Sequence, residues 1–504
     1  MKALTVSFGV KMKKIKKYKN VYSLIVMIVI SCLTQIVSVM KSSTVAGLFG
    51  LSNEMDAYNF ANSIVTFVFG LIAAGIPTVV IPSYVKEEKR ERIDTFLTMI
   101  YGFLAVLVFF LLVLRVQIVG FFSSREEVFV SVASSILIIL LFTQYLSSVP
   151  SVTTAYFQCN NKYNIPKVIN LITQSIVVVI LLVLKDMNIY QYAFIISGGV
   201  LLNFLTDGII AIRYGWRYKP TFWYADPKVK EMVAMFIPTL LSSSIYKLSL
   251  FIDSIIASHL DVGKLTVLSY SNHLTSIVNS VVIGNLLIYM YPKIIEKVKN
   301  DAPQHEFWDS VLLFHSIVCL IIAGFVSVGR EGISLLFEHG AFDSNAAYLV
   351  YIGTTIYICG QNTNIVRDLI YRYFYAKGDT KTTTANSVLV SVVNISVSLI
   401  LVRIIGFYGI IIGTVVASAV SLTMILVRYN NKFTIEVKIK KLAKDFLTNI
   451  LIGTITIIVV FMTKKVLHFN NIIEIILFGM ESVIVFVVLT VLMNRKVLQT
   501  LKNI

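Results

Sequence analysis

The sequence predicts an all-α polytopic membrane protein, and three observations carry this prediction. Of the 504 residues, 57% are hydrophobic and 14% are charged, whereas ordinary soluble domains carry about 25% charged residues. The mean hydropathy is +0.81. Apolar runs of about 20 residues, the length needed to span hydrocarbon, recur along the chain with short loops between them. No soluble domain fits between these runs.

Fourteen such runs are the expected transmembrane helices. They lie near 21–45, 56–84, 95–118, 128–153, 165–184, 189–212, 232–258, 265–291, 308–328, 346–374, 384–402, 406–427, 446–463 and 471–493.

The distribution of positive charge predicts the orientation of these spans. The chain has 44 Lys and Arg against 27 Asp and Glu, a net charge of +17. If the N-terminus is inside, 34 of the cations fall in cytoplasmic segments and 7 in outer loops. The positive-inside rule therefore predicts an even number of spans with both termini in the cytoplasm. It also explains the basic charge without nucleic acid as a partner.

A weak internal repeat predicts how the spans are grouped. The stretch "YFQCNNKYNIPKVIN" (156–170) is echoed by "YFYAKGDTKTTTAN" (373–386), about 217 residues later. In each, an aromatic helix end is followed by a polar turn and a new span. Parallel repeats of this kind are a transporter architecture. We therefore expect the following parts: a basic cytoplasmic N-terminus (1–20), a six-span lobe (21–230), a second six-span lobe (231–430), an added helix pair (446–493) and a cytoplasmic tail (494–504).

No motif indicates catalysis. The sequence has no P-loop, HExxH or GxSxG pattern, its six histidines are scattered, and its four cysteines are isolated. We therefore predict that the protein is not an enzyme and holds no cofactor. Energy for transport would come from an ion gradient, a substrate gradient or the membrane potential.

Charged residues inside the apolar runs are the candidate functional residues. A charge in hydrocarbon costs about 2.5–3.5 kcal/mol on insertion scales, so it usually faces a cavity or a partner. Lys41 lies in the first run, Asp56 opens the second, Lys247 and Asp253 lie in the seventh, and His273 lies in the eighth. A cationic cavity between the lobes would suit a phosphate or diphosphate. Alternatively, Lys41 lies near the end of its span and reaches the headgroups.

Two arginines, Arg367 and Arg372, lie near the cytoplasmic end of the tenth run. They are candidates for a gate or a contact between the lobes. The alternative is that they are structural ion pairs or anchors at the membrane interface.

Three stretches resemble the MurJ/MviN family of lipid II flippases, within the MOP (multidrug/oligosaccharidyl-lipid/polysaccharide) superfamily. They are "VAGLFGLSNEMDAYNFANSIVTFVFGLIAAGIPTVVIPSYVKE" (45–87), "LLFEHGAFD" (335–343) and "RDLIYRYFYAKGDTKT" (367–382). The resemblance implies a MATE/MOP-like fold with two added helices, in a bacterial plasma membrane. It implies that the protein moves an undecaprenyl-diphosphate-linked saccharide from the inner to the outer leaflet by alternating access.

The resemblance also suggests which residues bind substrate. The family's basic residue in span 1 corresponds to Lys41, its acid at the start of span 2 to Asp56, and its basic residue in span 8 to His273. An earlier span 1 arginine of the family falls at Gln35, and Lys247 can replace part of the charge lost there.

The family's arginine pair in span 2 falls at Phe69 and Gly70, so this chain departs from the pattern. That departure puts lipid II itself in doubt. A flippase for capsule or O-antigen repeat units is therefore a rival prediction.

The resemblance further implies a sodium site between spans 7, 11 and 12. Its residues here are Asp253, Asn394, Ser398 and Thr414, whose hard oxygens suit a hard cation. Ser398 stands where an acid can occur, so the site has one carboxylate. A structural polar cluster is the alternative interpretation, and a proton is the alternative coupling ion.

Two functions of other classes remain open. A MATE-like small-molecule exporter would share the helical bundle, although candidate bases at Lys41, Lys247 and His273 disfavour cationic substrates. The other is a non-transporting scaffold for envelope assembly. The expected partners are a polyprenyl-diphosphate-linked glycan and membrane lipids. Envelope-synthesis enzymes are further expected partners if the protein is a flippase or a scaffold in envelope assembly.

Overall fold

A computed structural model describes residues 2–86, 88–160, 162–184, 186–284, 294–296, 303–433 and 439–502. These residues divide into two compact units. The first consists of Met1–Thr44, Val68–Ile118 and Ser134–Ser243, and the second of Val45–Phe67, Val119–Ala133 and Ser244–Ile504.

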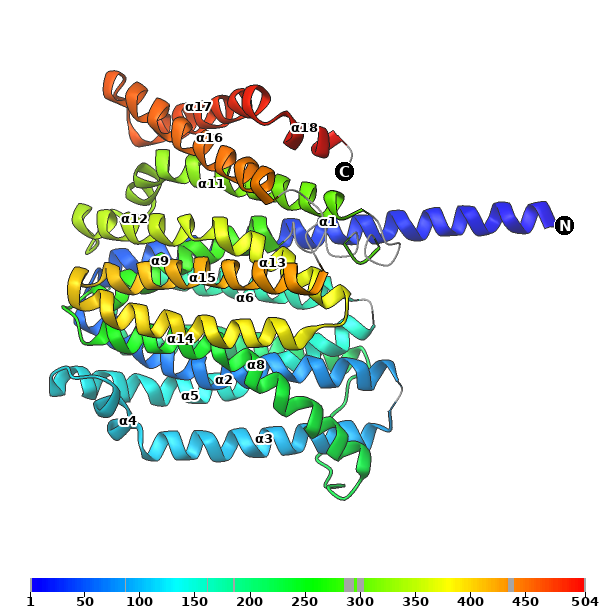
Figure 1. The fold of residues 1–504 in the computed structure, drawn as a ribbon. Coiled ribbons are helices and arrows are strands. Elements are labelled where there is room, and N and C mark those ends of the chain that lie inside the picture. The colour runs from blue at the N-terminus through cyan, green and yellow to red at the C-terminus, as the bar shows by residue number, and fades with distance from the viewer. Residues whose placement is uncertain are drawn as a thin grey trace. The chain divides into compact units, whose positions relative to one another are not determined.

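The described residues form helices, and no strand occurs among them (Figure 1). In chain order the helices are α1 (Lys2–Phe49), α2 (Asn53–Val85), α3 (Arg90–Val113), α4 (Arg115–Phe122), α5 (Glu127–Cys159), α6 (Asn164–Val183), α7 (Ile189–Arg213), α8 (Pro227–Ser258), α9 (Lys264–Val278), the π-helical turn η1 (Asn279–Ile283), α11 (Gln304–Phe337), α12 (Ser344–Cys359), α13 (Gln361–Ala376), α14 (Thr380–Ile405), α15 (Tyr408–Phe433), α16 (Ile439–Val466), α17 (Asn471–Met493) and α18 (Arg495–Lys502).

Local sequence sets several helix starts. The side chain of Asn188 caps α7 and forms a reciprocal capping box with Gln191. Asp343 accepts a hydrogen bond from the Ala346 N–H at the start of α12, and Asn470 caps α17 in the same way. Each cap satisfies a backbone N–H that has no partner within its helix.

Eleven helices in the described part of the chain are long and apolar enough to cross a membrane, so the expected count of fourteen is not confirmed. The seventh expected span corresponds to α8. The eighth begins as α9 and continues into η1, and its residues 285–291 lie outside the described residues. The tenth is broken at Gly360 into α12 and α13.

Within the second unit, α14 and α15 pack along each other (Figure 1). A Cβ atom on Gly409 would lie 2.4 Å from the Leu401 carbonyl carbon, and one on Gly413 would lie 2.3 Å from Ser398 Oγ. The two glycines form a GxxxG pattern, which lets two helix backbones approach closely. This close approach positions the polar residues of α14 described below.

The C-terminal helices α16 and α17 pack against α11 (Figure 1). A buried polar cluster joins them: Asn449 of α16 donates to the Leu312 carbonyl at 3.3 Å, and Asn494 donates to Asn449 Oδ1 at 2.9 Å. Buried amides are stable when they are paired in this way. The helices of the expected added pair therefore lie within the second unit. The domain boundaries that we predicted stay predictions.

Two of the stretches that carry the resemblance meet in the second unit. The Ala341 N–H, in the loop after α11, donates to the Gly47 carbonyl of α1 at 2.7 Å. Gly340 adopts φ +60°, and a Cβ atom there would lie 2.2 Å from Gly47 O. Only glycine fits, because both the backbone conformation and the backbone contact exclude a side chain.

Candidate functional site

In the first unit, Lys41 faces a neighbouring helix. Its Nζ donates to Gln174 Oε1 of α6 at 3.3 Å, and the side chain is partly buried. Lys41 lies eight residues before the end of α1, about 12 Å along the axis. A second lysine links the same helices, because Lys167 Nζ of α6 donates to Ser31 Oγ of α1 at 2.8 Å. Both lysines therefore link α1 to α6 through a polar side chain.

In the second unit, the carboxylate of Asp56 is fully buried and paired with protein donors. Its Oδ2 accepts from the Gly263 N–H at 2.8 Å and lies 3.0 Å from Arg125 Nη2. Its Oδ1 accepts from the N–H and the hydroxyl of Thr266 at 2.8 and 2.7 Å. Since Gly263 and Thr266 are at the start of α9, Asp56 caps that helix from α2 and meets the positive end of its dipole.

Arg125 completes this arrangement from the loop between α4 and α5. Its guanidinium donates to the carbonyls of Ser258, Leu260 and Asp261 at 2.9–3.1 Å. We predicted Asp56 to bind substrate. In the structure its carboxylate instead forms a buried ion pair with Arg125 and accepts three further hydrogen bonds, so it is not open to a ligand.

The second buried carboxylate of this unit, Asp253 of α8, has different surroundings. Asn394 Nδ2 of α14 lies 3.4 Å from its Oδ2 and donates to Ser249 Oγ at 2.6 Å. Asp253 Oδ1 is buried and has no hydrogen-bond partner among the described residues. Ser398 Oγ lies 3.3 Å from Asn394 Oδ1 and from the Ile410 carbonyl.

The residues of the expected sodium site are therefore gathered in one cluster. Thr414 Oγ1 also donates to the Ile410 carbonyl at 3.3 Å, so hydroxyl, amide, carbonyl and carboxylate oxygens lie together. The set fits a small hard monovalent cation, because the oxygens are hard ligands and the unpaired Asp253 Oδ1 supplies one negative charge. Gly413 permits the arrangement by letting Ser398 approach α15.

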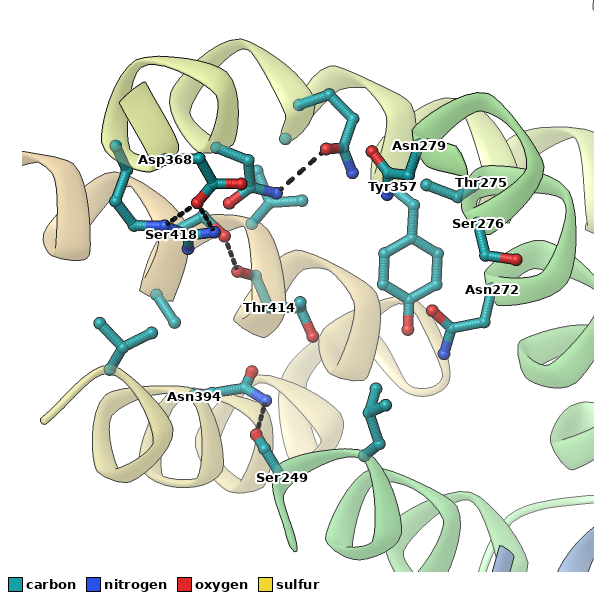
Figure 2. Close-up of a pocket in the computed structure, with 18 of the residues that line it drawn as sticks. Ser249, Asn272, Thr275, Ser276, Asn279, Tyr357, Asp368, Asn394, Thr414 and Ser418 are labelled. Carbon is teal, nitrogen blue, oxygen red and sulfur yellow. Dashed lines mark hydrogen bonds and ion pairs between the residues drawn. The ribbon is translucent and has the colours of Figure 1, made fainter. Parts of the chain in front are cut away.

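Beside this cluster lies a polar cavity of about 480 Å³ (Figure 2). It is enclosed by α8, α9, η1, α12, α13, α14 and α15, all with residues of the second unit. Twelve of its 22 lining residues carry amide or hydroxyl side chains: Ser249, Asn272, Thr275, Ser276, Asn279, Tyr357, Gln361, Asn364, Ser391, Asn394, Thr414 and Ser418.

Comparison with known proteins identifies the family. The chain matches the family described as "Lipid II flippase MurJ" over residues 45–489, which is most of its length. The chain belongs to the MurJ lipid II flippase family. It is 23% identical over 443 residues to a probable lipid II flippase MurJ of Thermotoga maritima, covering 84% of this chain and 88% of that protein.

Solved structures place this MurJ family chain within the MOP fold. It is similar to "Lipid II flippase MurJ, inward closed conformation" with a TM-score of 0.80 and 19% identity, covering 94% of this chain and 100% of the other. An inward-facing multidrug resistance MATE family transporter of the MOP superfamily matches with a TM-score of 0.61 and 12% identity, over 81% and 96% of the two chains. These likenesses confirm the predicted fold class.

The other residues predicted for this MurJ family chain lie in different units. Gln35 is partly buried on α1 in the first unit, whereas Lys247 of α8 and His273 of α9 are partly buried in the second. Of the predicted gate pair, Arg367 lines the polar cavity and donates twice to Asp368 Oδ1, at 3.0 and 2.9 Å. The substrate and gate roles of these residues stay predictions.

Sequence analysis missed three contributors to these sites. Gln174 and Arg125 were missed because their partners, Lys41 and Asp56, lie 133 and 69 residues away in the chain. No local sequence pattern predicts such a pairing. The GxxxG pattern at Gly409 and Gly413 could have been recognised, because its four-residue spacing in an apolar run indicates a close helix contact.

Proposed function

We propose that this protein is a flippase that carries an undecaprenyl-diphosphate-linked saccharide, with lipid II as the first candidate, from the inner to the outer leaflet by alternating access. The observation that carries the proposal is membership of the MurJ family over residues 45–489. Relatives of nearly the same length, such as the Thermotoga maritima protein, bear the name lipid II flippase.

Lys41 is the residue that we propose to bind the diphosphate. It is a cation within a membrane-spanning helix, and its side chain donates a hydrogen bond to the neutral amide of Gln174 at 3.3 Å. An amide leaves the positive charge of the ammonium uncompensated, so an anionic group gains a charge-assisted hydrogen bond there. Lys247 and His273, in the second unit, are separate candidates for binding an anion.

The test compares Lys41→Ala with Lys167→Ala, because both lysines link α1 to α6 through a polar side chain. We expect Lys41→Ala to lower lipid II translocation in proteoliposomes at least tenfold, Lys41→Arg to keep most of it, and Lys167→Ala to stay near wild type. Complementation of a strain depleted of its lipid II flippase provides the matching cellular measurement. Equal activity of both alanine variants would show that Lys41 merely links two helices.

A second candidate substrate is another polyprenyl-linked glycan, such as a capsule or O-antigen repeat unit. It is favoured by Gln35, Phe69 and Gly70, which stand where the family resemblance leads us to expect arginines. With fewer permanently charged side chains at these positions, the protein would select less strongly for the charged headgroup of lipid II. Translocation of a capsule-type lipid, without translocation of lipid II, would establish this alternative.

We further propose sodium as the coupling ion, bound by Asp253, Asn394, Ser398 and Thr414. The support is the gathering of their oxygens and the unpaired Asp253 Oδ1. The ion would supply positive charge to this carboxylate, and the chain would supply the oxygen ligands and exclude water around them. A proton is the alternative ion.

Both termini are proposed to lie in the cytoplasm of a bacterial cell, from the count of 34 inner against 7 outer cations. Single cysteines introduced at Glu338 and Lys440, in a chain whose native cysteines are serine, test this orientation. An impermeant maleimide should label Glu338→Cys in intact cells and leave Lys440→Cys unlabelled. The opposite labelling would reverse the orientation.

A further inference from the structure

The polar cavity of the second unit has one wall built on a single helix face. Asn272, Thr275, Ser276 and Asn279 follow the spacing i, i+3, i+4, i+7, so they share one face of α9 and the start of η1, and all four line the cavity (Figure 2). Polar side chains within a membrane protein face a polar interior or a ligand, because burial without a partner is costly.

The opposite walls repeat the same chemistry. Gln361 and Asn364 of α13, Tyr357 of α12 and Ser418 of α15 point into the cavity. The buried Oδ1 of Asn364 has no hydrogen-bond partner among the described residues, although its Nδ2 lies 3.4 Å from Gln361 Oε1. The cavity therefore offers amides and hydroxyls, groups that both donate and accept hydrogen bonds.

The charge of the lining excludes a diphosphate as the preferred ligand. Among the described lining residues there is one cation, Arg367, and there are two acids, Asp253 and Asp368. The Arg367 guanidinium is already bound to Asp368 through two nitrogens. An anion entering here would meet one excess negative charge or, with a sodium ion bound at Asp253, no net charge. An uncharged polar group has no such penalty.

The backbone also departs from a regular helix at this wall. α9 widens at Asn279 into the π-helical turn η1, and its Asn279 and Ile283 line the cavity. Single π-turns within α-helices are frequent at functional sites, because the extra residue re-aims the side chains around it. This observation is independent of the amide and hydroxyl composition.

We propose that this cavity binds the saccharide part of the lipid-linked substrate through the amides of Asn272, Asn279, Gln361 and Asn364. The inference rests on the proposed function. Sugar hydroxyls and acetamido groups both donate and accept, which matches this lining. The volume of about 480 Å³ lies within the range of about 300–1,000 Å³ that small-molecule pockets occupy. The diphosphate then binds outside this cavity.

The experiment measures binding of two lipids to the purified full-length protein in nanodiscs. One probe is undecaprenyl diphosphate, and the other is the same lipid carrying N-acetylglucosamine. The wild type should bind the sugar-bearing lipid at least tenfold more tightly. In Asn279→Leu that preference should fall about tenfold, because a bound sugar would leave its polar group unpaired. Binding of the bare lipid should stay unchanged.

Gln361→Leu, on the facing wall, provides a second variant in case Asn279→Leu does not fold. Thr423→Leu is the matched control, because Thr423 is exposed on α15 and is not among the lining residues. A wild type without preference for the sugar-bearing lipid overturns the proposal, and so does equal weakening of both lipids in the folded variants. A third outcome also overturns the proposal. If neither lipid displaces bound ethidium from the wild type, and Asn279→Leu no longer binds ethidium, the cavity binds organic cations instead.

Translocation of lipid II by the wild type separates this proposal from the proposed function. If the wild type translocates lipid II but both variants retain the preference for the sugar-bearing lipid, the saccharide cavity is refuted and the proposed flippase function stands. A protein that prefers the sugar-bearing lipid but does not translocate lipid II refutes lipid II flipping and keeps the cavity.

Discussion

Two aspartates of the second unit are almost equally buried, with 0% of Asp56 and 1% of Asp253 exposed, but their surroundings differ. Asp56 meets two backbone N–H groups, one hydroxyl and one guanidinium. Asp253 Oδ2 lies 3.4 Å from the Asn394 amide, the Thr414 hydroxyl is also near the carboxylate, and Oδ1 has no hydrogen-bond partner among the described residues. Burial alone therefore does not distinguish the two sites.

The difference shows how a carboxylate in a membrane protein can be assigned to structure or to binding. A buried charge is stable when hydrogen bonds and an opposite charge replace its water. Asp56 has both, so its role is complete within the protein. Asp253 has neither an opposite charge nor a full set of donors in the described structure, so a cation would complete its coordination.

The largest expected effect is at Asp56. Asp56→Ala leaves the Arg125 guanidinium, 9% exposed, without its counter-charge and uncaps α9. Breaking one side of a buried ion pair costs about 3–5 kcal/mol, so we expect a large loss of thermal stability, measured by unfolding in detergent. Asp56→Ala combined with Arg125→Met should recover part of this loss. A single variant as stable as the wild type would show that the pair carries no stability.

A smaller effect on stability is expected at Asp253, and it should depend on sodium. Asp253→Asn should change the free energy of unfolding by less than about 1 kcal/mol in choline chloride, because no ion pair is broken. At sodium tenfold above its dissociation constant, the wild type should gain about 1.4 kcal/mol, and the variant should gain none. The measurement is the melting temperature in sodium chloride and in choline chloride. Stabilisation of the variant by sodium would place the ion elsewhere.

The smallest effect is expected at Asp379, which lies just before α14 and outside the membrane-spanning segment. Burial alone would raise its pKa, but hydrogen bonds from Lys432 and Thr382 hold the pKa at about 2. Because the folded pKa lies below the ordinary value, the stabilisation is present above about pH 4 and is lost as the pH falls toward 2.

We expect this contribution to stay below about 1 kcal/mol, because the Lys432 side chain is half exposed and water screens the pair. The melting-temperature difference between wild type and Asp379→Asn should shrink between pH 5 and pH 3. A difference that does not vary with pH would show that the ion pair adds nothing to the cap.

The sequence predicted the fold class, and the family resemblance named residues that the structure brings together near Asp253, whereas the surroundings of Asp56 were missed. Hydropathy detects long apolar runs, so α11 and α14 were expected near their true places. It does not detect a break such as that at Gly360, because one glycine hardly changes the average. The Asp56 ion pair was missed because a charge count assigns Arg125 to a side of the membrane and says nothing about burial.

The GxxxG contact between α14 and α15 simplifies the mechanics of the proposed ion site. Backbones in direct contact cannot slide past each other without a clash, so Asn394 and Ser398 on one helix keep a fixed spacing from the Ile410 carbonyl on the other. The only carboxylate comes from a third helix, α8. The affinity for the ion is then governed by one geometric variable, the displacement of Asp253 from a rigid oxygen frame. Under this proposal, a movement of α8 that leaves the frame unchanged would alter the distance from Asp253 to the other oxygens, and the affinity for the ion would change with it.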